Sequence, residues 1–383
     1  MWLNRSIPGF IIAAFLFVGC QSVKQQNGSL PSPPTSSQLL YLVDDGRVTT
    51  YSIDPNTLNL AMIGGPVDLI DVSSSLLQLV PSPNDRFVYL LWSDAGQQEH
   101  LSAYATDSAG IPQAPPVQVL NVSSLSQLSV HPSGELAYAI HIESSAGMYT
   151  STIFLFHVTA SGTLQMDTHA QGVYGPAVVP TLLYGLSGDG TQLYIRSEEE
   201  NGSAYWQRAV NPQDGTLGTD ILLFSSPFMD SVALGRTVIV EYQNALTCSE
   251  PRYLKVFANN PEPSRQLIQC GSDMLQACGT ATDVQIHPSG HYLFLTDPAS
   301  QKIRIERMNM SNEVIADTGN FIPFTMQTPG FAFSPDGTLV YALLACDCSL
   351  HVYRFDQSSG YLVQGPASIP MTSSAGFLPA TRP

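Results

Sequence analysis

Lysine is scarce in this sequence, and charged residues of any kind are few. The only lysines among 383 residues are Lys24, Lys255 and Lys302, and Asp, Glu, Lys and Arg together make up 12% of the chain. The formal net charge is −16, from 31 acidic and 15 basic residues. Proteins that bind nucleic acid need clustered Lys and Arg. The composition therefore disfavours a nucleic-acid partner.

Helical periodicity is also missing. No long stretch has apolar residues at helical spacing, and no apolar run reaches the roughly 20 residues of a membrane-spanning helix. Turn formers are abundant instead, with 29 Gly and 28 Pro, and Tyr occurs 16 times. This composition is typical of an all-β protein with many turns.

The N-terminal 20 residues have the pattern of an export signal. Arg5 precedes an apolar run from Ile11 to Val18, and Gly19 and Cys20 follow it. A basic start, a short apolar core and a small residue at the cut are typical of a secretory signal. The end of the run, Phe17-Val18-Gly19-Cys20, resembles the bacterial lipobox, in which the cysteine becomes the lipid-acylated first residue of the mature chain. An ordinary cleaved signal with a chance cysteine is the alternative.

The chain is therefore predicted to have three parts. Residues 1–19 are a lipoprotein signal peptide, residues 20–38 are a flexible Pro/Ser-rich tether, and residues 39–383 are the folded domain. We expect an exported protein held in the cell envelope by a lipid on Cys20, at the outer membrane if the source is Gram-negative, because residue 21 is Gln rather than Asp.

A turn followed by an aromatic strand recurs along the folded part. In five copies a turn such as Pro335-Asp336-Gly337 precedes an aromatic residue, and two weaker copies lie at 39–43 and 234–240. Four antiparallel strands per 40–50 residues form the blade of a β-propeller. The sequence predicts an all-β, seven-bladed β-propeller with four antiparallel strands per blade. Its register residues are at positions 41, 89, 138, 194, 239, 294 and 341.

The ends of the chain predict how the ring closes. The first unit starts at its second strand, at Leu39, and has no innermost strand of its own, whereas Ala375–Pro379 follows the last complete unit. Pairing of this C-terminal strand with the N-terminal blade would remove an open edge.

The repeat resembles a known family. The matching residues are His-Pro-Ser-Gly at 131–134 and 287–290, Ser-Pro-Asp-Gly at 334–337, and the segment 356–362. These resemble the lactonase-like seven-bladed propellers, which include bacterial 6-phosphogluconolactonases and fungal muconate-lactonising enzymes. The resemblance covers about residues 39–380 and implies the architecture. The Asp-Leu-Gly-x-Asp segment of the enzymes is absent, since Tyr138-Ala139-Ile140 runs into His141-Ile142-Glu143, so no catalytic residue is carried over.

Few side chains are candidates for chemistry. His131 and His287 precede equivalent turns, and each could be a general base or a turn-capping residue. Arg196 could hold an anionic ligand, and Glu198–Glu200 form either a solvated charge run or a cation- or sugar-binding edge. The segments 44–46 and 187–190 have the composition of turns rather than of complete calcium loops. We expect no cofactor and no metal site.

Five cysteines remain once Cys20 is assigned to lipid. In an oxidising compartment disulfides are expected, and Cys248 is placed to pair with Cys270 or Cys278. Cys346 and Cys348 either close a small ring or stay reduced.

Two functions from different classes fit this sequence. The first is an envelope-anchored binding or scaffolding propeller, monomeric, with a protein or small-molecule ligand on one propeller face. The alternative is a lactonase-like hydrolase acting on a sugar lactone or a related small molecule, an activity that the family resemblance implies.

Overall fold

The computed structural model describes residues 38–381, with gaps at 45, 55, 72–73, 178–180, 200–201, 227–230, 235–237, 243–251, 259–267, 276–283, 298–299, 310–313, 325–329, 345–348 and 371–375. All regular elements in this part of the chain are β-strands. Among the same residues, none forms a helix long and apolar enough to cross a membrane. The prediction of an all-β propeller is confirmed.

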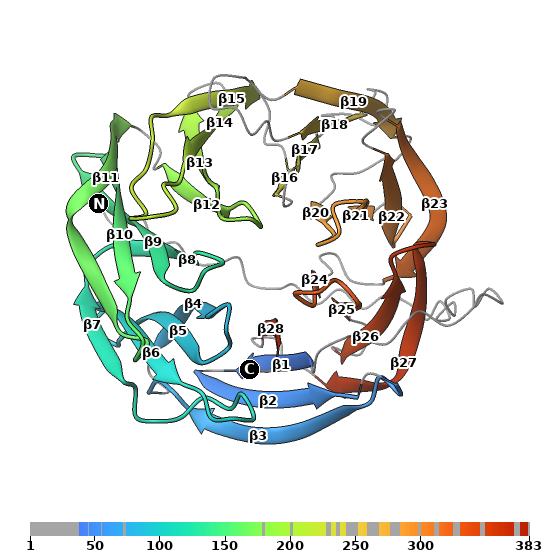
Figure 1. Cartoon of the computed structure of the whole chain (residues 1–383), viewed down its shortest axis with the longest axis horizontal. Coiled ribbons are helices and arrows are strands. Elements are labelled where there is room, and N and C mark those ends of the chain that lie inside the picture. Colours follow the sequence, from blue (N-terminus) through green and yellow to red (C-terminus); the bar gives the residue numbers. More distant parts are fainter. Residues whose placement is uncertain are drawn as a thin grey trace.

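The strands form seven four-stranded antiparallel sheets arranged in a ring (Figure 1). The first sheet contains β28 (Gly376–Thr381), β1 (Gln38–Asp44), β2 (Arg47–Ile53) and β3 (Leu60–Asp68). The second contains β4 (Ser75–Pro81), β5 (Phe87–Ser93), β6 (Glu99–Ala105) and β7 (Gln118–Val122). The third contains β8 (Leu125–Val130), β9 (Leu136–Ser145), β10 (Met148–Val158) and β11 (Leu164–Ala177).

The remaining four sheets follow in chain order. The fourth contains β12 (Leu182–Leu186), β13 (Gln192–Glu199), β14 (Gly202–Ala209) and β15 (Ile221–Ser226), and the fifth contains β16 (Ser231–Leu234), β17 (Val238–Tyr242), β18 (Arg252–Ala258) and β19 (Ile268–Leu275). The sixth contains β20 (Val284–Ile286), β21 (Tyr292–Asp297), β22 (Lys302–Asn309) and β23 (Val314–Pro323), and the seventh contains β24 (Gly330–Phe333), β25 (Leu339–Leu343), β26 (Ser349–Asp356) and β27 (Tyr361–Pro370). In the second to seventh sheets the chain runs from the ring interior outward, and in the first sheet the C-terminal β28 lies innermost (Figure 1).

The ring closes as the sequence predicts. Strand β28 pairs antiparallel with β1, with Tyr41 opposite Leu378. Strand β1 begins at Gln38, the residue at which we expected the tether to end, and its side-chain amide donates to Asp336 in the seventh sheet at 3.0 Å. The first and last parts of the folded chain therefore share one sheet, and polar bonds join that sheet to its neighbour.

The core lies between adjacent sheets. Tyr89, Leu101 and Phe156 belong to one buried cluster between the second and third sheets. A fully buried apolar side chain of this size stabilises the fold by about 1.5–3 kcal/mol. The register residues resolved with side chains are at most 2% exposed: Tyr41, Tyr89, Tyr138, Tyr194, Phe294 and Tyr341.

Glutamine side chains join neighbouring sheets. Gln78 donates to the carbonyl oxygen of Leu128 at 3.0 Å and accepts from the N–H of the same residue at 2.7 Å. Gln118 makes the same pair of bonds to Leu164. A buried backbone N–H or C=O without a hydrogen-bond partner destabilises the fold. These glutamine amides provide partners for backbone groups of the neighbouring sheet.

Candidate functional site

The antiparallel order of the strands gives the ring two different ends. The turns between the first and second strands of a sheet, such as Pro132–Gly134, Pro288–Gly290 and Pro335–Gly337, lie at one end, which we call the turn face. The loops between the second and third strands, such as residues 94–98 and 146–147, lie at the opposite end, which we call the loop face. The sequence candidates are divided between these two ends.

His131 and His287 lie on the turn face and hold adjacent sheets together. His131 Nε2 lies 3.1 Å from the carbonyl oxygen of Gly190, and His287 Nε2 lies 2.6 Å from that of Gly337. In both cases Nδ1 accepts from a backbone N–H two residues later, at 3.1 Å. Both ring nitrogens are used within the fold, so the turn-capping interpretation is the one that the geometry supports.

Burial acts strongly on His287. Its side chain is fully buried, and this burial lowers its pKa to about 4, against the smaller opposing effects of its bond to Gly337 and of the Asp336 charge. The imidazole is therefore neutral near pH 7, with its proton on Nε2.

The turn candidate at residues 187–190 is explained by local hydrogen bonds. Asp189 accepts from the Ser187 hydroxyl at 2.6 Å and from the N–H of Thr191 at 3.0 Å. These bonds and others to Thr191 lower the pKa of Asp189 against the effect of its burial, which is the largest. In the candidate at 44–46, Asp44 ends β1 and Gly46 precedes β2, while Asp45 lies outside the described residues. No group of three or more His, Cys, Asp or Glu side chains in the described residues is arranged to hold a metal ion.

Arg196 lies on β13, where its guanidinium carbon is 5.9 Å from the centre of the Tyr205 ring. Its neighbour Ile195 packs between the third and fourth sheets. Because successive side chains of a strand point to opposite faces, Arg196 faces away from the third sheet. The side chains of Glu198–Glu200 lie outside the described residues, as do Cys20, Cys248, Cys270, Cys278, Cys346 and Cys348.

A cluster of titratable side chains lies between the second and third sheets at the loop face. Leu101 on β6 and Ala139 on β9 belong to the buried cluster between these sheets. Glu99 lies two residues before Leu101, and His141 lies two residues after Ala139, so their side chains are on the same strand faces as this cluster. Glu143 lies two residues after His141. We call Glu99, His141 and Glu143 the Glu99 cluster.

Burial dominates the electrostatics of Glu99. Desolvation raises the pKa of this carboxyl group, and three smaller effects oppose it: backbone N–H groups of Leu125 and Ser124 donate to the carboxylate, and the charge of His141 favours the ionised form. Its Oε2 is shielded from solvent and has no hydrogen-bond partner. Burial therefore favours the protonated form of Glu99, the form that can act as a general acid.

His141 lies beside the carboxyl group of Glu143. Its Nε2 is 3.8 Å from Glu143 Oε1, and its side chain is 16% exposed whereas that of Glu143 is 69% exposed. On its other side the ring packs edge-on against Phe154, with the ring centres 5.9 Å apart. The cluster therefore reaches from the inter-sheet core to the surface.

The repeat offers an internal comparison for Glu99. In the third sheet the corresponding position is Ser151, whose hydroxyl accepts from the N–H of Thr181 at 3.0 Å, just before the innermost strand of the next sheet. A hydroxyl is thus sufficient to cap this backbone group. Glu99 makes the equivalent contact with Leu125 and Ser124 and also brings a second oxygen and an ionisable proton.

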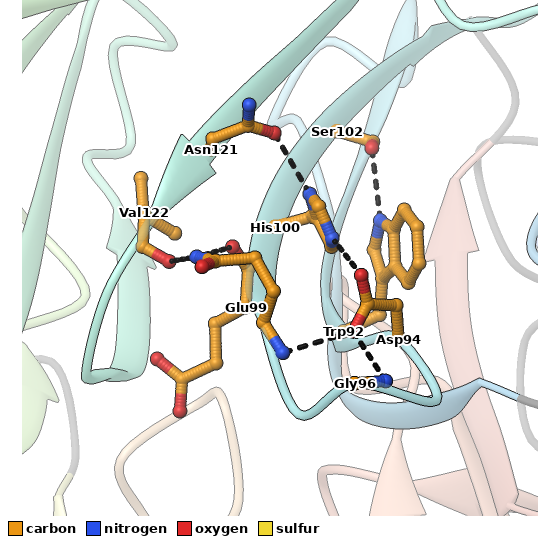
Figure 2. A network of polar contacts seen from close by, with 9 residues as sticks. Trp92, Asp94, Gly96, Glu99, His100, Ser102, Asn121 and Val122 are labelled. Atoms are coloured by element: carbon orange, nitrogen blue, oxygen red, sulfur yellow. Dashed lines mark hydrogen bonds and ion pairs between the residues drawn. The ribbon is translucent and has the colours of Figure 1, made fainter.

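The opposite side of β6 carries a separate polar network (Figure 2). His100 Nε2 lies 3.2 Å from Asp94 Oδ2, and Nδ1 lies 3.0 Å from Asn121 Oδ1. The ring stacks on Trp92 with the centres 4.2 Å apart, and Trp92 donates to the Ser102 hydroxyl at 2.9 Å. Figure 2 shows the Glu99 carboxylate pointing away from this network. Both nitrogens of His100 face oxygens, so His100 is a structural residue of the loop.

Sequence reasoning did not select Glu99 and treated His141 only as a departure from the enzyme motif. The available signal was the repeat itself. Aligning the third strands places Glu99 where the third sheet has Ser151, a substitution of a neutral cap by an acid.

Comparisons with known proteins show which solved structures have a similar fold. No family model matches the chain, and no curated protein matches it. Among solved structures, a candidate 6-phosphogluconolactonase from Bacteroides fragilis has a TM-score of 0.61 at 14% identity, over 91% of this chain and 99% of that one. The periplasmic gluconolactonase PpgL from Pseudomonas aeruginosa has a TM-score of 0.57 at 16% identity, over 91% and 99%.

The same ring also matches part of a different enzyme. Prolyl oligopeptidase B from Galerina marginata has a TM-score of 0.56 at 10% identity, over 86% of this chain and 51% of that one. Since proteins with different chemistry share this architecture, the likenesses show that the chain has the β-propeller fold that the lactonase-like structures also have.

Proposed function

We propose that the protein is a lactonase-like hydrolase that opens the ring of a small lactone at the Glu99 cluster. The observation that carries the proposal is Glu99, a carboxyl group whose pKa burial raises, beside His141 at the loop face. An acid and a base with different environments are what general acid–base hydrolysis requires. The full-length likeness to the Pseudomonas aeruginosa gluconolactonase supports the choice of substrate class.

His141 and Glu99 each carry out one proton transfer, His141 as the base and Glu99 as the acid. The imidazole of His141 takes a proton from a water molecule as the water oxygen bonds to the lactone carbonyl carbon. The bond from that carbon to the ring oxygen then breaks, and the ring oxygen takes the proton of Glu99. The product is the open hydroxy acid, and proton exchange with solvent through His141 and the exposed Glu143 restores the starting state.

A lactone panel tests the proposal. We expect the protein without its signal to hydrolyse glucono-δ-lactone or an aliphatic lactone, and Glu99→Gln and His141→Asn to lower kcat at least about 100-fold, the usual contribution of a general acid or base. Glu135→Gln and His131→Asn are the matched controls, because both residues lie on the turn face. Absence of turnover in the wild type, or full activity in both site variants, would contradict it.

A second candidate is a binding or scaffolding module. It is favoured by exposed apolar side chains on outer strands of the first four sheets: Met62, Val119, Met166, Val173 and Leu222. Isolated exposed apolar residues are common, but several on outer strands suit a protein partner. Crosslinking in intact cells, mapped by mass spectrometry, should place a partner on these strands, and crosslinks confined to the loop face would count against it.

The export and lipid anchoring of the protein are also a proposal. We infer from residues 1–20 that the chain is exported, acylated on Cys20 and held at the envelope as a monomeric seven-bladed ring. The expected result is incorporation of labelled fatty acid by the wild type and none by Cys20→Ser. Labelling of the variant, or its retention in the membrane fraction, would contradict this.

A further inference from the structure

Both ends of the folded chain lie at the turn face. Strand β1 is the second strand of the first sheet and joins β2 at the loop face, where Asp44 pairs with Arg47. The first residue of β1, Gln38, is therefore at the turn face, and its amide donates to Asp336 in the turn of the seventh sheet at 3.0 Å. Thr381, the last residue of β28, lies opposite Gln38. Whatever precedes or follows the folded domain thus leaves the ring from this one face.

Gln38 also lies in the inner part of the ring. It is buried, and β2 and β3 lie between β1 and the rim, by which we mean the outer strands of the sheets (Figure 1). Neighbouring strands are about 4.8 Å apart and residues rise about 3.3 Å along a strand. From Gln38 to the loop face, a chain outside the ring must cross about 10 Å of turn face and then about 30 Å of rim along β3.

The separation of Cys20 from Gln38 limits how far the domain can turn. A flexible chain of about 18 residues, which is this separation, has a root-mean-square end-to-end distance of about 20–25 Å. This length reaches from a bilayer to the turn face, whereas the path to the loop face is about 40 Å. Stretching the connecting chain to nearly twice its ordinary length lowers its conformational entropy. A lipid on Cys20 therefore favours the turn face as the side nearer the membrane.

The charge of the protein does not compete with this effect. Clusters of Lys and Arg draw a protein surface onto anionic lipid, but this chain has a formal net charge of −16. The rim is the competing surface, because it carries exposed apolar side chains such as Met62 and Val119. The attachment point and the rim therefore predict different orientations, which an experiment can separate.

We propose that the protein stands on the membrane with its turn face toward the bilayer and its loop face toward the surrounding compartment. This rests on the proposed lipid anchor at Cys20. The loops at 94–98 and 146–147 are then open to soluble ligands and partners, whereas a partner at the turn face would have to fit between the ring and the bilayer.

Three single-tryptophan variants report on the turn face, the rim and the loop face of the second sheet. Without residues 1–19, the chain has only Trp92 and Trp206. Trp206→Phe leaves Trp92, next to the loop at 94–98, as the loop-face reporter. With both tryptophans changed to Phe, Ser108→Trp places a reporter in the exposed turn-face connection between β6 and β7. Val119→Trp in the same background places one on the rim, where Val119 is 47% exposed. Each variant must melt as the wild type does.

Energy transfer to the membrane measures the orientation. Acylated protein is bound to vesicles of phosphatidylethanolamine and phosphatidylglycerol that carry a dansyl-labelled lipid. We expect transfer from the Ser108→Trp variant to exceed transfer from Trp92 at least about twofold, because the length of β5, about 20 Å, separates the two positions. Equal transfer from these two reporters, or the highest transfer from the Val119→Trp variant, would overturn the proposal.

Artificial anchors test the geometry without acylation. A hexahistidine tag replaces residues 1–20 and binds vesicles that contain a nickel-chelating lipid. The order of the three reporters should be the same as in the acylated protein, and the same again with the tag after Pro383, because Thr381 lies opposite Gln38. A tag inserted after Gly147, in the loop-face hairpin of the third sheet, should reverse the order. An order that does not depend on the position of the tag would overturn the proposal.

The anchor and the orientation can fail separately. If the protein is not retained on vesicles through Cys20 while both terminal tags give the expected order, the lipid anchor fails and the orientation set by the chain ends stands. If the acylated protein binds and its three reporters transfer energy equally, the anchor stands and the orientation fails.

Discussion

His287 Nε2 donates to the carbonyl oxygen of Gly337 at 2.6 Å and so joins the turn of the sixth sheet to that of the seventh. The N–H of Ser289 donates to Nδ1 of the same ring at 3.1 Å. These two bonds require the neutral tautomer with its proton on Nε2. A pair of bonds that only one protonation state can make links the stability of the ring to pH.

The free energy of unfolding is predicted to fall as the pH drops from 6.5 to 4. The folded-state pKa of His287 is about 4 and the ordinary value is 6.5, so in this window the unfolded chain binds a proton that the folded chain does not. The contribution lost by pH 4 is about 3 kcal/mol, at about 1.4 kcal/mol per pKa unit. Urea unfolding of wild type and His287→Gln between pH 7.5 and 4 measures it, and a pH-independent difference between them would contradict the prediction.

Removal of the closing strand is predicted to destabilise the domain. Deleting residues 372–383 removes β28 and exposes the inner edge of β1 along Gln38–Val43. Loss of about five backbone hydrogen bonds at about 1 kcal/mol each should lower the melting temperature by about 10 °C. Deleting only residues 382–383 is the control. An unchanged melt after the longer deletion would show that β28 does not hold the ring closed.

The ion pair of Arg208 and Asp220 in the fourth sheet, which Tyr174 of the third sheet contacts, should contribute measurably to stability. Arg208 and Asp220 form two hydrogen bonds of 2.6 and 2.9 Å, with side chains 11% and 29% exposed, and Tyr174 donates to Asp220 at 2.8 Å. Because Arg208→Met leaves a half-buried carboxylate unpaired, we expect a loss of about 2 kcal/mol.

The control for this variant is Arg86→Met, since Arg86 stacks over Phe87 on the surface and its loss should cost less than about 1 kcal/mol. Chemical denaturation of both variants decides the matter. Equal losses in the two variants would mean that the Arg208–Asp220 pair contributes no more than an exposed arginine.

Lactone hydrolysis is predicted to decline as the pH rises through the pKa of Glu99. Glu99 must carry a proton to protonate the leaving oxygen, and burial raises the pKa of this group. The rate should therefore fall as the pH rises through that raised pKa. The pH profile of kcat measures this, and Glu99→Gln should lack the alkaline limb. A limb that persists unchanged in the variant would assign it to another group.

The cysteines are predicted to be oxidised in part. Cys248 should be joined to Cys270 or Cys278 in protein exported to an oxidising compartment. Mass spectrometry of a non-reduced digest identifies the linked peptides. Five free thiols would contradict the disulfide prediction.

Most of the fold could be read from local patterns. Turn residues such as Pro335 and Gly337 sit at a fixed distance from a buried aromatic such as Tyr341, and every sheet except the first pairs only neighbouring segments of the chain. Strand pairing over short separations leaves a periodic trace in sequence. Even the closing strand was predictable, because the first unit starts at Leu39 without an inner strand.

The candidate site could not be read in this way. Glu99 and His141 lie on different sheets, and neither belongs to a motif. His131 and His287 stood out because they repeat, and the structure uses that repetition to join turns.

The sequence by itself determined the number and order of the strands, since each strand is defined by turns and alternating apolar residues within about 50 positions. Only the tertiary structure decided which polar side chains meet. Packing one sheet against the next desolvates Glu99 and brings the charge of His141 close to it. The physical reason is that burial and electrostatic coupling depend on distance in space, which local sequence patterns do not record.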